Sequence, residues 1–298
     1  MLKIAVLGVL LSATAWADTK GQKLPLPEVK LVSAGSGARQ QLRVKPTVGT
    51  KQTMVMGLKM AMSIDSAMVK LPKTQLPVMK MTMEAKVTDV DKSGDVHYDY
   101  AFTKVDVDGA GAKQEVVDAV KKSSASLVGI TGHVIVNTRN FTTFADINIP
   151  PDVEPTVRQM LDSITQSFSQ LSAPFPEEAV GVGAKWRVKM TLSLNGITLK
   201  QDANYTLTKL DGNQLAATIT LDQKADPQPF TGPSVPAGLK MSVVSWTGSG
   251  GGDLVYDMSK FLATRATMSA TSAAKMSIEM GTDHQVMAMQ TDVTVEVR

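Results

Sequence analysis

The feature that most constrains the fold is an alternation of apolar and polar residues that begins at Thr53. Every second side chain from there is apolar, and the residues between are polar or small. The apolar positions are Met54, Met56, Leu58, Met60, Met62 and Ile64. Because successive side chains of a strand point to opposite faces, this period of two predicts a long, half-buried β-strand.

The same texture recurs along the chain. A second alternating run covers 79–88, turn-forming residues follow at 91–95, and 96–102 alternates again, which predicts a hairpin. We expect further strands near 133–136, 141–149, 186–194, 197–199, 205–210, 215–221, 240–248, 252–258, 264–271, 275–281 and 285–297. Strands joined by hairpins form an antiparallel sheet, and a sheet this long must curl, split or close.

Two segments have a helical period instead. Between Pro150–Pro151 and Pro174, apolar residues recur at intervals of three and four, which predicts a helix over 152–172. A shorter helix is expected over 114–126. The predicted fold class is therefore mainly β (β-rich α+β). We expect a large curved antiparallel sheet or half-barrel, with one long and one short helix covering its concave face.

The N-terminus has the pattern of a secretory signal. A basic head at Lys3 precedes an apolar run over 4–11, and Ala15-Trp16-Ala17 fits the small-residue cleavage rule. We expect residues 1–17 to be a signal peptide cleaved after Ala17, and the mature protein to be periplasmic or secreted. No later apolar run is long enough for a transmembrane segment.

The remaining chain is expected to form one domain with a leading arm. Pro25 and Pro27 deny residues 18–39 a helix or a central strand, so a flexible N-terminal arm is predicted. Residues 40–298 should form a single antiparallel β-rich domain. It divides into two similar halves, 40–150 and 174–298, joined by the helix over 152–172.

Two segments resemble a known group of proteins. PFPEEAVGVGAKW at 174–186 and GGGDLVYDM at 250–258 are similar to segments of an exported bacterial family of unknown function. That family resembles in layout the LolA-like lipoprotein-carrier superfamily. The resemblance implies a curved antiparallel half-barrel whose helices cover an apolar cavity for lipid or acyl chains. It implies no catalytic residues.

Neither catalysis nor nucleic-acid binding is indicated. The three histidines lie far apart in sequence without metal-ligand spacing, and Gly248-Ser249-Gly250 lacks the order of a nucleophile elbow. No cysteine is present, so disulfides and thiolate metal sites are excluded. A formal charge of +3 without a Lys/Arg block does not indicate a nucleic-acid partner. We expect a non-enzyme without a cofactor.

One turn has the spacing of a calcium loop. Its candidate ligands are Asp89, Asp91, Ser93 and Asp95. The twelfth position, where a calcium loop places a bidentate Glu, is Tyr100, and the flanking segments are predicted strands. Asp and Gly are also what a hairpin turn selects, so an ordinary turn is the favoured interpretation.

The eighteen methionines leave three interpretations open. Many occur at Met-x-Met spacing, which on a strand places them on one face about 7 Å apart. Unbranched thioethers can fill the core of a twisted sheet, line a site for variable apolar ligands, or bind Cu(I) as soft donors.

The hypothesis we favour is a non-catalytic exported protein that binds a hydrophobic, lipid-like ligand in a Met-lined cavity. The predicted lining is Met54, Met56, Met60, Met62, Met79, Met81, Met83, Met160, Ile164 and Phe168. An envelope structural or interaction protein without a cavity is the first alternative. A periplasmic Cu(I)-binding protein is the second.

Overall fold

The computed structural model describes residues 22–67, 70–109, 111–148, 173–194, 196–230, 240–280 and 283–298. The predicted signal peptide over 1–17 and the predicted helix over 152–172 lie outside these residues. Within them, no helix combines the length and the apolar character needed to cross a membrane.

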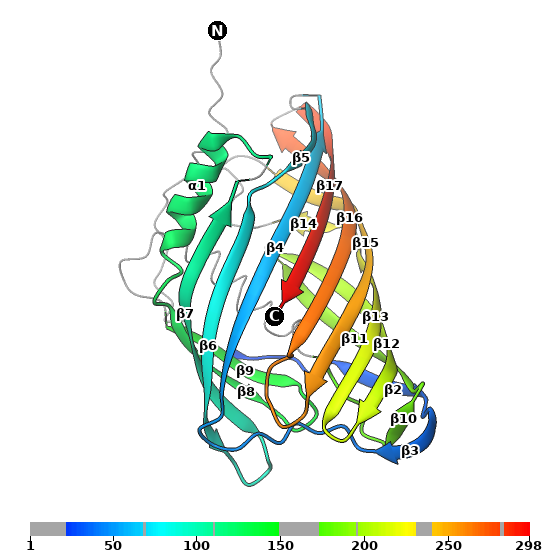
Figure 1. The fold of residues 1–298 in the computed structure, drawn as a ribbon. Coiled ribbons are helices and arrows are strands. Elements are labelled where there is room, and N and C mark those ends of the chain that lie inside the picture. The colour runs from blue at the N-terminus through cyan, green and yellow to red at the C-terminus, as the bar shows by residue number, and fades with distance from the viewer. Residues whose placement is uncertain are drawn as a thin grey trace.

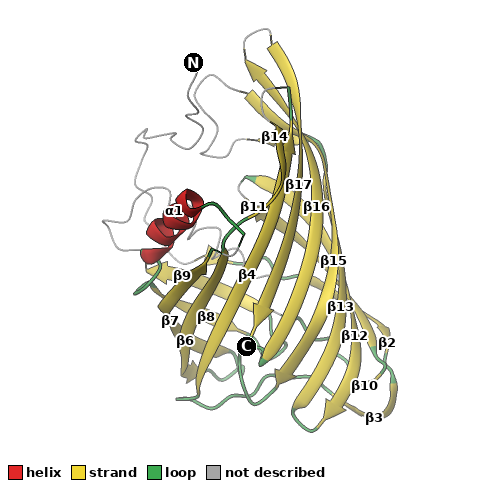
Figure 2. Cartoon of the chain, turned by 45° about the horizontal axis from the view of Figure 1, so that its top comes forward, coloured by secondary structure: helices red, strands yellow, loops and turns green. Residues whose placement is uncertain are grey.

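The fold is dominated by one open antiparallel sheet, which confirms the mainly-β prediction (Figure 1). Its strand order is β1-β9-β8-β7-β6-β4-β17-β16-β15-β13-β12-β11-β2, with β5 paired to β4 and β14 paired to β15. The strands at its two ends curve round behind the long central strands (Figure 2). A separate pair joins β3 (Ser36–Gln40) to β10 (Val180–Val182).

The strands of the large sheet, in chain order, have the following bounds. They are β1 (Gln22–Lys23), β2 (Glu28–Ser33), β4 (Lys51–Asp65), β5 (Lys70–Gln75), β6 (Val78–Val90), β7 (Val96–Asp108), β8 (Thr131–Val136), β9 (Thr142–Asn148), β11 (Lys185–Leu194), β12 (Ile197–Asp211), β13 (Gln214–Ala225), β14 (Gln228–Phe230), β15 (Lys240–Asp257), β16 (Arg265–Met280) and β17 (Asp283–Val297).

The shorter predicted helix is confirmed as α1 (Gln114–Ala125). Helix α1 packs against β7 through Val117, which is buried. Gly109 faces that valine, and a Cβ there would collide with the Val117 side chain. The chain then enters the core at Leu127 and Ile130, both almost fully buried. The helix therefore leads directly into the packed interior.

Two predicted strand breaks are wrong. The glycines at 248–252 were expected to separate two strands, but β15 runs unbroken through them, and β16 likewise runs through 271–275. A Cβ at Gly250 or Gly252 would collide with carbonyl oxygens of the neighbouring strand β16. Glycine at these positions permits a close approach between strands in a curved sheet. In the sequence, such glycines look the same as glycines that mark a turn.

The described part of the predicted N-terminal arm is paired rather than free. Strand β1 pairs with β9 at one end of the sheet, and β2 pairs with β11 at the other end. Pro25 and Pro27 lie in the short crossing between them. The prolines thus prevent pairing only within the crossing, and the flanking residues supply the edge strands that prolines do not forbid.

Candidate functional site

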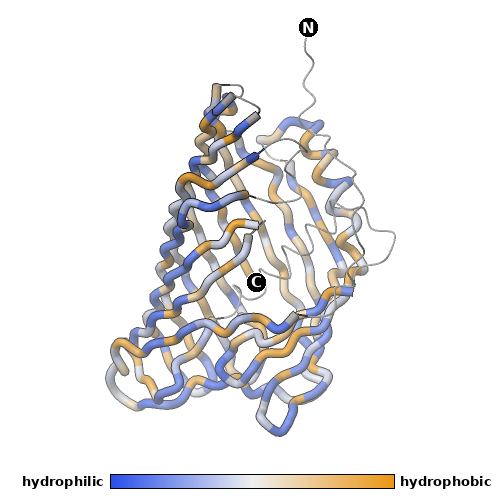
Figure 3. Tube along the Cα trace, turned by 180° about the vertical axis from the view of Figure 1, so that it is seen from behind, coloured by the Kyte–Doolittle hydropathy of each residue, from blue (hydrophilic) through white to orange (hydrophobic). Residues whose placement is uncertain are grey.

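The sheet register brings the two methionine runs together. Across β4 and β6, Met54 lies opposite Met83, Met56 opposite Met81, and Leu58 opposite Met79. Side chains on this inward face alternate with polar outward residues along the long strands, visible as orange and blue bands in Figure 3. The predicted shared face of the two runs is therefore present.

Burial divides these methionines into two groups. Four are packed in the main core, with exposed fractions of 6% for Met54, 8% for Met79, 4% for Met81 and 1% for Met83. Met56, Met60 and Met62 are only half-buried. Core packing therefore explains the first group. Met56 also packs against the main core, to which Met60 and Met62 do not belong. Met160, Ile164 and Phe168 lie outside the described residues.

The inward face carries two apolar clusters with a strip between them. The main core is centred on large side chains such as Trp186, Tyr256 and Phe102. The second cluster consists of buried residues near the other end of the same face, with half-buried neighbours that include Trp246. Its buried members are Leu192, Ile197, Leu199, Ala225, Val243 and Met276.

The strip between the clusters follows two rows of register partners, and we call it the middle band. The first row is Gln201, Gln223, Gly248, Ser272, Thr291 and Met62. The second row continues it with Gly250, Ala270, Val293 and Met60. All ten residues are half-buried, and none belongs to either cluster.

The chemistry of this region is uncharged. The middle band and both apolar clusters contain no Asp, Glu, Lys, Arg or His among the described residues. The polar members of the band are amides and hydroxyls, and Gln223 Nε2 donates a hydrogen bond of 2.7 Å to Gln201 Oε1. A ligand lying here would meet methionine, small residues and neutral polar groups.

Trp246 introduces a buried donor beside the band. It lies on β15 two residues from Gly248, hence on the same face, with Ala225 and Ala274 as register partners. Its indole Nε1 is buried and has no hydrogen-bond partner within the described chain. Nothing in the sequence pattern distinguishes this tryptophan from an ordinary core residue.

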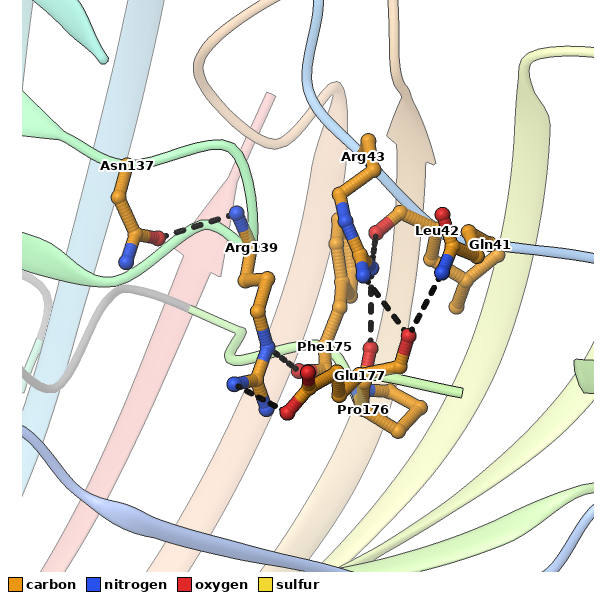
Figure 4. A network of polar contacts seen from close by, with 8 residues as sticks. All are labelled: Gln41, Leu42, Arg43, Asn137, Arg139, Phe175, Pro176 and Glu177. Carbon is orange, nitrogen blue, oxygen red and sulfur yellow. Dashed lines mark hydrogen bonds and ion pairs between the residues drawn. The ribbon is translucent and has the colours of Figure 1, made fainter. Parts of the chain in front are cut away.

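Residues 173–177, which we call the seal, lie at the end of the inward face next to the main core, to which Ala173 and Phe175 belong. The seal includes the start of the segment 174–186, and Figure 4 shows its residues 175–177. Each of these five residues has its carbonyl oxygen bound by a side chain from elsewhere. Asn140 Nδ2 donates to Ala173 O (3.2 Å), Trp186 Nε1 to Pro174 O (2.9 Å) and Arg139 Nε to Phe175 O (3.1 Å). Arg43 donates from Nη1 to Pro176 O (3.1 Å) and from Nη2 to Glu177 O (2.7 Å).

These bonds explain how a segment without regular structure is held in the interior. Two of its residues are prolines, which offer no N–H to a sheet. Burial and the neighbouring Arg139 lower the pKa of Arg43. Because the carbonyls are satisfied individually, this segment is a fixed seal rather than a part of the middle band.

The turn with calcium-loop spacing, for which an ordinary turn was the favoured interpretation, uses the carboxylate of Asp91 internally. Asp91 Oδ1 accepts hydrogen bonds from Ser93 N (2.8 Å), Ser93 Oγ (2.6 Å) and Asp95 N (3.0 Å). These bonds hold the pKa of Asp91 below its ordinary value. Among the described residues, no group of three His, Asp or Glu side chains is placed to hold a metal ion.

Two histidines that are distant in sequence lie together on the outward face. The rings of His97 on β7 and His133 on β8 have centroids 5.6 Å apart, and His133 Nδ1 lies 2.7 Å from Asp99 Oδ1. His133 and Asp99 also line a groove of about 650 Å³ that includes Lys86 and Asp146. Only the strand register could have revealed this pairing.

One comparison with known proteins gives a match. Residues 161–260 match the model of a family of unknown function (DUF6263). No curated protein matches the chain. The matched range contains both segments, 174–186 and 250–258, on which the predicted family likeness rests, and this likeness to a family of unknown function is confirmed. The further likeness to lipoprotein carriers stays a prediction.

Proposed function

We propose that this exported protein binds a hydrophobic, lipid-like ligand at the middle band, without catalysis. The observation that carries the proposal is the position of Met60 and Met62: they are half-buried in the band and belong to neither apolar cluster, whereas four other methionines fill the core. Half-buried thioethers on the inward face of a curved sheet suit apolar ligands of variable shape.

The absence of Asp, Glu, Lys, Arg and His from the ten residues of the middle band supports the proposal. Apolar chains gain from contact with methionine and valine, at roughly 25 cal/mol per Å² of area removed from water.

The first test is native mass spectrometry of freshly purified protein before and after organic extraction. A co-purified apolar molecule supports the proposal, bound copper favours the Cu(I) alternative, and a clean chain favours the structural alternative. A second test measures displacement of the neutral fluorophore Nile red by methyl laurate.

A matched pair of variants on β16 locates the binding. Ala270 faces the band, whereas Ala273 is exposed on the opposite face. Ala270→Phe should fill the band and weaken Nile red binding at least tenfold, while Ala273→Phe should leave it unchanged. Equal binding by both variants, or no binding of the dye by the wild type, contradicts the proposal.

A further inference from the structure

The unpartnered indole N–H of Trp246 is the starting point. Buried polar groups in folded proteins almost always have a hydrogen-bond partner, and an orphan calls for a specific explanation. The Trp246 Nε1 atom is buried, and no described residue accepts its hydrogen. An indole nitrogen can only donate, so whatever satisfies it must offer an acceptor.

The position of this donor connects it with the middle band. Trp246 lies on the inward face of β15, on the edge of the second cluster and two residues from Gly248. Gly248 pairs in register with Gln223, whose amide is bonded to Gln201. Donor, amide pair and apolar surface therefore adjoin on one face.

Charge limits what can supply the acceptor. A carboxylate or phosphate buried here would meet no Lys, Arg or His among the ten residues of the middle band. Burying an unpaired anion is strongly unfavourable, whereas a neutral carbonyl needs only one good donor. The acceptor that suits this site is an uncharged carbonyl oxygen attached to an apolar chain.

Resting on the proposed function, we propose that the ligand is an uncharged acyl ester whose carbonyl oxygen accepts a hydrogen bond from Trp246 Nε1. The Gln201–Gln223 amide pair borders the ester group. The acyl chain follows the band toward Met60 and Met62 on β4. The site thereby distinguishes esters from hydrocarbons and from ionised fatty acids of similar length.

The test compares three probes that compete with Nile red: methyl laurate, laurate and pentadecane. We define the ester preference as the affinity for methyl laurate divided by the affinity for pentadecane. Because the ester loses more hydration than the hydrocarbon on binding, the informative quantity is the change in this preference when the donor is removed. Laurate at neutral pH should bind more weakly than its methyl ester.

Trp246→Phe keeps an aromatic ring and removes the N–H. It should lower this preference about tenfold, equivalent to about 1.4 kcal/mol, while leaving pentadecane binding unchanged. Trp186→Phe is the matched control, because its N–H is already bonded to Pro174 O, and it should keep the preference. Infrared spectra of carbonyl-labelled methyl laurate should show a hydrogen-bonded ester with wild type and a free ester with Trp246→Phe.

The outcomes separate the two proposals. An equal ester preference in wild type and Trp246→Phe overturns the ester inference and leaves hydrophobic binding intact. Tighter binding of laurate than of its ester also overturns it. If none of the three probes displaces Nile red and the dye itself does not bind, the proposed function is wrong.

Discussion

Replacing one core methionine, Met83, and one methionine of the middle band, Met60, by alanine should show whether the two groups contribute differently to stability. Met83 is 1% exposed and lies between Met54 on β4 and Phe102 on β7. Met83→Ala leaves a cavity in the main core, for which about 2–5 kcal/mol is typical. Met60 is half-buried beside Val293. Because Met60 is only half-buried, Met60→Ala loses only part of the side chain's transfer free energy. The free energy of unfolding should therefore fall by about 1 kcal/mol.

Urea unfolding of both variants and the wild type measures these differences through the midpoint, provided that the slope m stays constant. Met83→Leu nearly conserves volume and should cost less than about 1.5 kcal/mol, which controls for side-chain identity. Nile red affinity should fall for Met60→Ala and not for Met83→Ala. Equal destabilisation by the two truncations would refute the division of the methionines.

Three further predictions concern the seal, the close strand approach and the tyrosines. Arg43→Ala leaves the carbonyl of Pro176 without its donor and should lower the free energy of unfolding by about 1–3 kcal/mol. Arg43→Lys should recover little of this, because a single ammonium replaces the two guanidinium nitrogens that bind two carbonyls. Gly252→Ala should lower the free energy of unfolding by more than about 2 kcal/mol, because the new Cβ would collide with β16. Gly57→Ala, whose Cβ would meet only ordinary contacts, should change it by less than about 0.5 kcal/mol. Urea midpoints measure both changes. Burial raises the pKa of all four tyrosines above the ordinary value. They are Tyr98, Tyr100, Tyr205 and Tyr256. These buried phenols stabilise the folded state fully below the pKa of an unfolded tyrosine, about 10. Above that pH the free energy of unfolding falls by about 5 kcal/mol per pH unit for the four together. Near-ultraviolet absorbance should therefore show tyrosinate only as the chain unfolds. Gradual ionisation in the folded state would contradict this.

The strands could be predicted because alternation is a local property. The run from Met54 to Ile64 and the turn at 91–95 carry their own signals, and the structure has a strand and a hairpin there. The glycines at 248–252 misled the prediction because a turn and a close strand approach select the same residue. Local signals therefore predict elements better than they predict continuity.

The candidate site depends on register, which the sequence pattern does not contain. Nothing local indicates that Gln201 and Gln223 lie beside each other, or that His133 lies against His97. The seal over 173–177 was visible as a motif, but its function as an acceptor of side-chain hydrogen bonds depends on residues more than a hundred positions away, such as Arg43. Pairing across the sheet creates these groupings.

The family match covers one part of the site and leaves another part outside its range. The matched range of 161–260 contains the seal, the Gln201–Gln223 pair, Gly248 and Trp246. The methionine runs on β4 and β6 lie outside it. Ser272 and Thr291 of the middle band also lie outside the matched range, as do Met60 and Met62. In the proposed function, the donor that selects the ligand and the deformable surface that accommodates its chain lie on different strands of one sheet, β15 and β4.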